Sequence, residues 1–279
     1  MTRNLSHCNL FINFASMMNT KKPLILISND DGYHAKGINS LIDMLKGKGD
    51  IIVCAPESAR SGYSRAFSTV TLSLKHRRHY DYEDTTIDVW SCSGTPADCI
   101  KMAYHKLCPK KADIVIGGIN HGDNASTNLH YSGTVGVVME GALKRIPSIA
   151  FSLCDYDDDA DFEPMRPLVQ QMVDKILKEG LPAYTCLNVN VPMDWNGDTR
   201  LCRMAHGHWR SEVDERRHPN GKPYYWMAGY YQNDEPDAED TDAWAVSHGY
   251  AAITPLTADQ TDYKYLAMHD SIHNSSLGT

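Results

Sequence analysis

The chain of 279 residues has no apolar run approaching the roughly 18 to 20 residues that a membrane-spanning helix needs, which argues against an integral membrane protein. Positive charge is also scarce, because Lys and Arg total 27 against 35 Asp and Glu, for a net charge of −8. Such a surface has no general cationic field to attract nucleic acid by counterion release. We therefore expect no long nucleic-acid partner, and an anionic substrate must be held by something local.

Cysteine motifs are missing as well. The eight cysteines form no C-x-x-C pair and no Cys/His array with zinc-finger spacing, and a disulfide scaffold is not expected in a chain this long. Cys54 lies within an apolar run and Cys99 within a helical pattern, so both are interpreted as small buried hydrophobic residues. We expect a reducing compartment, the cytoplasm.

The first residues lack the features of a signal peptide. A short apolar patch, Leu10 to Ala15, is preceded only by Arg3 and is followed by no clear small-x-small cleavage site. Met17 and Met18 lie just ahead of the first strong strand pattern. We interpret residues 1–20 as a leader or the product of a misassigned start, outside the fold, and expect residues 21–279 to form a single domain.

From Pro23 onward, apolar runs of strand length alternate with helical patterns. Runs that are apolar on both faces and separated by helices are typical of a mostly parallel sheet covered on each side, which predicts an α/β fold. The expected strands are residues 23–28, 51–55, 113–117, 148–153, 186–191 and 250–254, and the expected helices are 37–45, 134–144, a stretch around 168–177 and one that starts at Thr95 to Asp98.

The stretch from Arg203 to Asp242 interrupts this alternation, since it is polar, aromatic and rich in turn residues. Pro219-Asn220-Gly221 separates two segments that are expected to pair as a hairpin. The aromatic side chains could stack on a nucleobase, but packing between subunits is the favoured interpretation. These residues are Tyr224, Tyr225, Trp226, Tyr230 and Tyr231.

Three polar loops follow expected strands of the sheet. They are residues 29–32, 58–62 and 117–124. Ligands of open parallel sheets bind outside the carboxyl ends of the strands, so the three loops are expected to converge on one crevice.

The first of these loops contains two adjacent carboxylates, Asp30 and Asp31. A loop can turn both toward one hard cation, and Asn and Ser oxygens would complete a ligand set suited to Mg, Mn or Ca. Taken alone, Asp30-Asp31-Gly32 is also compatible with a simple turn and helix cap. The absence of a neighbouring Lys or Arg, together with the two other polar loops, favours the metal site.

Tyr131-Ser132-Gly133-Thr134 leads directly into an expected helix. Hydroxyls and bare backbone amides at a helix start can bind phosphate, although an ordinary Ser/Thr cap explains the same residues. There is no G-x-G-x-x-G and no G-x-x-x-x-G-K-[ST], so neither the usual dinucleotide fold nor a P-loop is supported.

The histidines near these loops belong to no recognisable catalytic triad. His34 and His121 are interpreted as hydrogen-bonding or shape-setting loop residues. The pair His206 and His208 has no carboxylate or Cys nearby at ligand spacing, so we interpret it as structural.

Five ordered motifs closely resemble those of the SurE family of metal-dependent nucleotidases. They are SNDDG at 28–32, the stretch ending in RSG at 60–62, GTPADC at 94–99, GINHG at 118–122 and YSGTVG at 131–136. The resemblance runs from about Lys22 to Leu256 and includes LNVNVP at 187–192, PYYW at 223–226 and Thr241-Asp242.

The resemblance implies a Rossmann-like three-layer α/β/α core, a C-terminal hairpin region at about 203–245 used for oligomerisation, and a homodimer or homotetramer. It also implies hydrolysis of nucleoside monophosphates at the 5′ or 3′ phosphate. The family's metal ligands, for one divalent cation per subunit, correspond to Asp30, Asp31, Ser61 and Asn120. Its phosphate-binding positions correspond to Asn124, Ser132, Gly133 and Thr134. The sequence departs from the family pattern at Ser126 and Asn128, where Gly and Asp are usual, so the resemblance does not extend to loop shape or substrate preference, while the implied ligands are unaffected.

The residues alone suggest a compatible mechanism. A cation at Asp30 and Asp31 would neutralise phosphate oxygens and lower the pKa of water, while the start of the following helix stabilises the phosphoryl group. Either aspartate could accept the proton. A phosphatase with an Asp nucleophile is disfavoured because such enzymes usually have D-x-D after the first strand. The non-enzymatic alternative is a metal-dependent nucleotide-binding protein without turnover.

Overall fold

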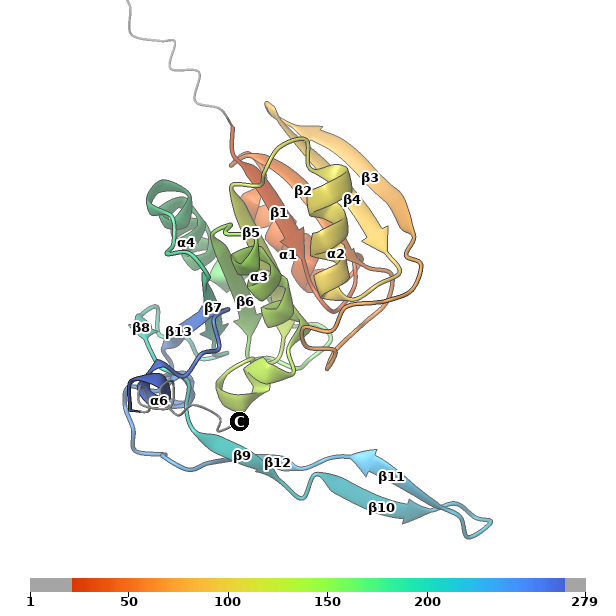
Figure 1. Ribbon diagram of the computed structural model, residues 1–279, viewed down its shortest axis with the longest axis vertical. Coiled ribbons are helices and arrows are strands. Elements are labelled where there is room, and N and C mark those ends of the chain that lie inside the picture. The colour runs from red at the N-terminus through yellow and green to blue at the C-terminus, as the bar shows by residue number, and fades with distance from the viewer. Residues whose placement is uncertain (1–21, 269–279) are drawn as a thin grey trace, which may run out of the picture.

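The computed structural model describes residues 22–268, and a nine-stranded sheet runs through their centre (Figure 1). The strand order is β3-β4-β2-β1-β5-β6-β7-β13-β8. The strands are β1 (Leu24–Ser28), β2 (Asp50–Pro56), β3 (Leu74–Tyr82), β4 (Thr85–Cys92), β5 (Ile114–His121), β6 (Ser148–Leu153), β7 (Thr185–Val191), β8 (Thr199–Leu201) and β13 (Ala251–Thr257). The expectation for residues 1–20 lies outside the described residues.

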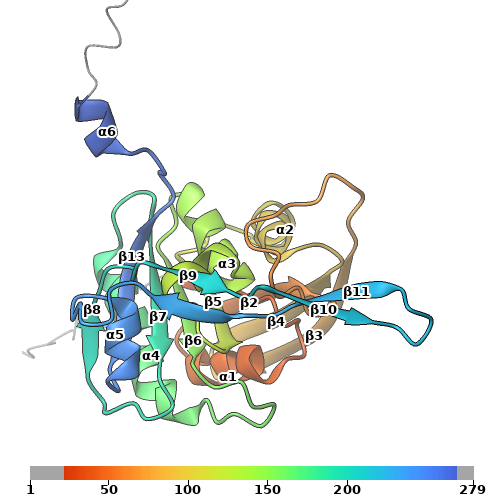
Figure 2. The same ribbon diagram turned by 90° about the horizontal axis from the view of Figure 1, so that it is seen from below.

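Helices cover both faces of the sheet. α1 (Lys36–Leu45) and α4 (Arg166–Glu179) cover one face, and α2 (Pro96–Met102) and α3 (Gly133–Leu143) cover the other. α5 (Asp242–Ser247) packs against β13, whereas α6 (Tyr263–Met268) has no buried residue and projects away from the sheet (Figure 2). There are also a π-helical turn η1 (Ala103–Leu107) and two 3₁₀ turns, η2 (Ser126–His130) and η3 (Glu163–Met165). The start predicted around Thr95 is present, because Thr95 Oγ1 accepts from the Asp98 backbone N–H and Asp98 accepts in return from that of Thr95. Within residues 22–268, no helix is both long and apolar enough to cross a membrane.

The strand side chains alternate between two buried layers. Ile25 and Ile27 of β1 pack under α1 and α4, whereas Leu24 and Leu26 belong to the core under α2 and α3. Both cores are apolar, so each face of the sheet needs its helical layer. The expected three-layer α/β/α arrangement with a mostly parallel sheet is confirmed (Figures 1 and 2).

The strand order reverses at β1, which pairs in parallel with β2 on one side and with β5 on the other. In open α/β sheets, this reversal separates the two connections that leave the neighbouring strands and opens a crevice at their carboxyl ends. The residues that follow β1 and those at the end of β5 therefore meet at the position where a ligand is expected.

One hairpin of the sheet was not predicted. β3 and β4 pair antiparallel, with β3 at the outer edge, and most β3 residues are exposed. Its sequence, LKHRRHYDY, has none of the apolar continuity of the central strands. Charged residues are common on such edges because they discourage pairing with other chains.

Within residues 203–242, which interrupt the alternation of strands and helices, the strands between Gly207 and Asn233 form a long arm outside the sheet (Figures 1 and 2). β9 (Gly207–Arg210) pairs antiparallel with β12 (Tyr230–Asn233), and β10 (Val213–Arg217) with β11 (Pro223–Met227). The turn at Gly221 joins the last two strands, so the predicted hairpin is confirmed.

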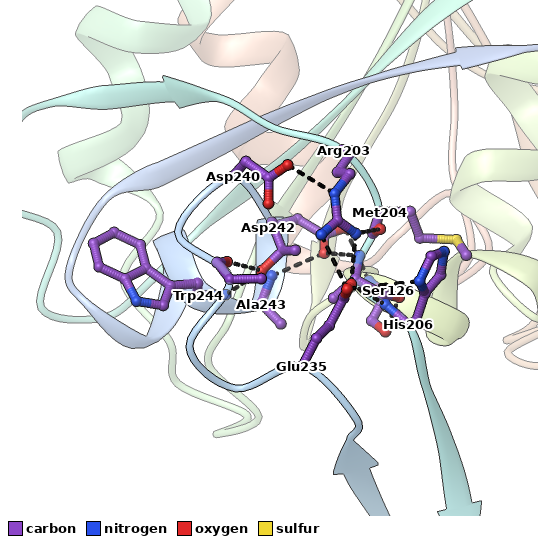
Figure 3. Close-up of polar contacts among 12 residues, drawn as sticks. Ser126, Arg203, Met204, His206, Glu235, Asp240, Asp242, Ala243 and Trp244 are labelled. Carbon is purple, nitrogen blue, oxygen red and sulfur yellow. Dashed lines mark hydrogen bonds and ion pairs between the residues drawn. The ribbon is translucent and has the colours of Figure 1, made fainter.

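Two charged residues, Arg203 and Asp242, hold the root of this arm, shown in Figure 3. Arg203 makes ion pairs with Glu235 (2.5 Å) and Asp240 (2.8 Å), and the first of these lowers the pKa of Glu235 to about 2. The buried carboxylate of Asp242 accepts hydrogen bonds from the backbone N–H groups of Ser126 and Ala205, each at 2.9 Å. Asp242 thereby ties the loop after β5 to the segment that enters the arm.

Candidate functional site

The first aspartate after β1 is held by the start of α3. Asp30 is only 3% exposed, and its Oδ1 accepts from the Thr134 hydroxyl at 2.5 Å while Oδ2 accepts from the Gly133 backbone N–H at 3.1 Å. Burial raises the pKa of Asp30, and these two donors oppose that shift. The contact requires glycine, because a Cβ on Gly133 would lie 2.6 Å from the Asp30 Cβ.

The second aspartate, Asp31, has fewer hydrogen bonds than Asp30 to offset its burial. Burial, and then the charge of Asp30, raise the pKa of Asp31 to about 7, while a hydrogen bond from the His121 backbone lowers it. Asp31 Oδ2 is buried and has no hydrogen-bond partner among the described residues. An unpartnered carboxylate oxygen is costly in a protein interior, and its presence beside a second carboxylate indicates a position for a cation.

Asn120 brings a third oxygen to this position from the end of β5. Its Nδ2 donates to the carbonyls of His121 (2.9 Å) and Gly122 (2.8 Å), so both amide protons are used. These bonds fix the orientation of the amide and leave Oδ1 on the other side, available as a ligand.

The loop after β2 reaches the same place. The Arg60 backbone N–H donates to the Asp30 carbonyl at 2.6 Å, which brings Ser61, the next residue, to the edge of the site. Ser61 is exposed. The three polar loops thus converge on the carboxyl end of β1, as the sequence predicts.

In this structure, Ser132, Gly133 and Thr134, which are predicted to bind phosphate, make hydrogen bonds to other protein groups. Ser132 Oγ accepts from the Val135 backbone N–H at 3.1 Å, as an ordinary helix cap does. Gly133 and Thr134 donate to Asp30. The cap alternative therefore describes the contacts of Ser132, and phosphate binding by these three residues stays a prediction.

Asn124 is positioned by hydrogen bonds to side chains of β6 and β7 that were not predicted to belong to the site. Its backbone N–H donates to Asn190 Oδ1 (2.7 Å), its Nδ2 to Ser152 Oγ (2.9 Å), and its carbonyl accepts from Asn188 Nδ2 (2.8 Å). These partners lie on β6 and β7. Asn188 and Asn190 alternate with apolar residues in a buried strand, a pattern that signals polar groups in need of partners.

The two departures from the family pattern both contact the arm. Ser126 has φ of 51°, in the left-handed region that favours glycine, and its hydroxyl donates to the Ala205 carbonyl at 2.9 Å and hydrogen-bonds with Tyr231. Asn128 Oδ1 accepts from the Trp209 indole N–H at 3.1 Å. These side chains therefore fix the arm against the loop that follows β5.

The histidines take positions around the site. His121 packs edge-to-face on Phe162, with ring centroids 4.8 Å apart, and His34 packs edge-to-face on Tyr33. His208 lies 3.1 Å from Asp234, at the root of the arm. Within residues 22–268 no three His, Cys, Asp or Glu side chains gather as a metal cluster, so a cation at this site depends on two carboxylates with Asn and Ser oxygens.

Comparison with known proteins gives one consistent result. The family model described as "Survival protein SurE" matches residues 25–211. A protein of Phocaeicola vulgatus named 5'-nucleotidase SurE is 49% identical over 247 residues, 88% of this chain and 95% of that protein. A Bacteroides fragilis protein of the same name is 46% identical over 253 residues, 89% of this chain and 97% of the relative.

The fold agrees with a solved member. The crystal structure of the SurE protein from Aquifex aeolicus superposes with a TM-score of 0.73 at 36% identity, covering 90% of this chain and all of that one. Together with the family model and the two relatives, this shows that the chain belongs to the SurE family.

Proposed function

We propose that this chain is a metal-dependent phosphomonoesterase that hydrolyses nucleoside 5′-monophosphates, and 3′-monophosphates as further substrates, to nucleoside and phosphate. The observation that carries the proposal is Asp31 Oδ2, a buried carboxylate oxygen without a partner beside the buried carboxylate of Asp30. The relatives named 5'-nucleotidase SurE, which match nearly nine-tenths of this chain, supply the substrate class.

The residues present fit one hard divalent cation per subunit, such as Mg or Mn. Asp30, Asp31, Asn120 and Ser61 would hold it, because two carboxylates, an oriented amide oxygen and a hydroxyl form the oxygen-rich set that such ions prefer. When bound, the cation neutralises charge on phosphoryl oxygens and makes water more acidic.

Residues of the chain would supply the proton acceptor and the phosphate-binding groups. Thr134 and Gly133 hold both oxygens of Asp30, whereas Asp31 Oδ2 has no protein donor. A carboxylate oxygen has two lone pairs, so one would face the cation, and we assign the other to accept the proton of the attacking water. The start of α3 places its positive dipole end at the site, which favours an anionic phosphoryl group near Ser132 and Gly133. Asn124 supplies a further polar position that β6 and β7 keep in place.

The test is a phosphate-release panel with AMP, GMP, 3′-AMP and a short polyphosphate, each with Mg, with Mn and with excess EDTA. We expect release from the mononucleotides only when the cation is present. Nucleotide binding without turnover under every condition would instead support the non-catalytic alternative.

We also propose that the region 203–245 serves oligomerisation within the single domain, as a homodimer or homotetramer. Its outer ladder exposes large apolar side chains, with Tyr225 61%, Trp226 58% and Met227 78% exposed. Exposed aromatic and Met side chains grouped on one strand are typical of protein interfaces. Light scattering of the native chain and of Trp226→Glu tests this, with a smaller assembly expected for the variant.

We propose a cytoplasmic location for the protein. The seven cysteines among the described residues are all free thiols, as a reducing compartment would keep them. Cell fractionation with an antibody against the native protein tests this.

A further inference from the structure

A cavity of about 260 Å³ lies between the loop after β5, the root of the arm and α5, and no step proposed above uses it. Its lining combines aromatic, apolar and acidic side chains. The residues that matter for its chemistry are Asp123, Asn128, Tyr156, Trp209, Tyr231 and Val246.

The aromatic walls are held in fixed positions. Trp209 on β9 and Tyr231 on β12 face each other across the ladder as register partners. The Trp209 indole N–H donates to Asn128 Oδ1 at 3.1 Å, and the Tyr231 hydroxyl hydrogen-bonds with Ser126. Both rings are half-buried, so each is anchored at its polar end while part of its surface stays available for contact.

The polar wall carries a negative charge. Asp123 Oδ1 accepts from Asn128 Nδ2 (3.0 Å) and from the Ala125 backbone N–H (3.2 Å), and Oδ2 accepts from the Tyr156 hydroxyl (2.7 Å). Two carboxylate oxygens offer about four acceptor sites, so one remains for a ligand. A carboxylate repels an anion, and the cavity therefore suits an uncharged, flat group that carries N–H or O–H donors.

The cavity lies close to the carboxylate site. Asp123 follows Asn120 by three residues, so their Cα atoms are at most about 11 Å apart. Asn120 Nδ2 also donates to the Gly122 carbonyl at 2.8 Å, which ties Asn120 to the residue that precedes Asp123. A substrate bound at the carboxylate site and extending past Asn120 toward Asp123 would reach this cavity.

We propose that this cavity is the nucleoside subsite, in which the base stacks on Trp209 and a donor of the base or ribose bonds to Asp123. The inference rests on the proposed function, because it extends the same substrate from the phosphoryl group to the nucleoside. It assigns the preference for nucleotides over simpler phosphomonoesters to the arm and the loop after β5.

The experiment compares AMP with ribose 5-phosphate, which lacks the base, in the native chain and in Trp209→Leu. Base stacking on an aromatic side chain is worth about 1–3 kcal/mol, so we expect the KM for AMP to rise about tenfold in this variant and the preference for AMP over ribose 5-phosphate to fall by the same factor. Trp209→Phe, which keeps an aromatic face, should retain most of the preference.

The matched control is Tyr230→Leu. Tyr230 neighbours Tyr231 on the same strand, is 58% exposed and points to the opposite face, away from the cavity lining. It should keep the native preference. Equal proportional losses on both substrates in Trp209→Leu would show that Trp209 only supports the arm and would overturn the subsite.

Calorimetry with adenosine separates this inference from the proposed function. Adenosine binding that is lost in Trp209→Leu supports the subsite even if the chain hydrolyses no phosphomonoester. Hydrolysis of AMP and ribose 5-phosphate with equal kcat/KM by the native chain, with no adenosine binding, would overturn the subsite and leave the phosphomonoesterase intact.

Discussion

The Thr134 hydroxyl donates a 2.5 Å hydrogen bond to Oδ1 of Asp30, joining the first turn of α3 to the residue that follows β1. Gly133 adds its backbone N–H to the other carboxylate oxygen. Hydrogen bonds to a charged acceptor in a buried position are stronger than neutral ones, and here they keep Asp30 in one orientation. The helix start therefore positions a carboxylate of the site as well as presenting its dipole to it.

Removing the Thr134 hydroxyl should weaken both the fold and the reaction. Thr134→Val deletes a bond to a buried carboxylate, which we expect to cost roughly 1.5–3 kcal/mol in the free energy of unfolding and to lower kcat about tenfold or more. Urea denaturation and phosphate release from AMP measure the two effects.

Thr254→Val is the matched control for this substitution. Thr254 is 1% exposed, and its Oγ1 has no hydrogen-bond partner within the described part of the chain, so its removal should leave stability equal or higher and kcat unchanged. If the two variants behaved alike, the contact between Thr134 and Asp30 would have no role in the site.

Asp31→Asn should stabilise the metal-free protein at alkaline pH. Burial and the charge of Asp30 raise the pKa of Asp31 from 3.8 to about 7, so the protonated carboxyl contributes stability that is complete below pH 3.8 and lost as the pH rises through 7. Asn is neutral throughout. In EDTA, the variant's advantage in free energy of unfolding should grow between pH 5 and pH 8 to an order of a few kcal/mol.

Thermal unfolding at several pH values in EDTA measures this advantage, and saturating Mn should reverse it by stabilising the native chain selectively. A difference between the two proteins that does not vary with pH would show that Asp31 is not a destabilising charge in the metal-free state.

Gly133→Ala should disturb Asp30 without unfolding the protein. The new Cβ would lie 2.6 Å from the Asp30 Cβ and 2.9 Å from its Oδ2, so the carboxylate must move away from its donors. We expect kcat for AMP to fall at least tenfold, on the scale seen when positioned groups are displaced. Gly221→Ala is a control for an added methyl group away from the site: the space around its Cβ is open, and its φ of 83° confines the strain to the arm's turn, so activity should stay native. Native activity in Gly133→Ala would refute this close contact.

The central sheet was predictable because its strands are buried on both faces. The lengths of the apolar runs at β1, β2, β5, β6 and β7 predict the lengths of these strands, and the helical patterns between runs predict that the strands are parallel. The edge strand β3 escaped prediction, since its side chains are charged and exposed and it is held mainly by backbone pairing with β4. Local sequence carries little information about a strand whose partner supplies most of its contacts.

The candidate site was predictable as a set of converging loops but not as a network of contacts. Strand-end loops can be located from periodicity alone, which brought Asp30, Asp31 and Asn120 together. The hydrogen bond between Thr134 and Asp30 joins residues 104 positions apart, so no local pattern shows that the start of the helix holds an aspartate of the site in place. The cavity beside Trp209 depends in the same way on how the arm docks, which the hairpin signal does not specify.

The most direct test of the account is phosphate release from AMP by the EDTA-stripped full chain as Mn is titrated back. We predict no release before addition, recovery in proportion to added ion, saturation at one Mn per chain, and no recovery in Asp31→Asn. Release at the full native rate in excess EDTA, or equal recovery in Asp31→Asn, would contradict a metal site built on Asp30 and Asp31.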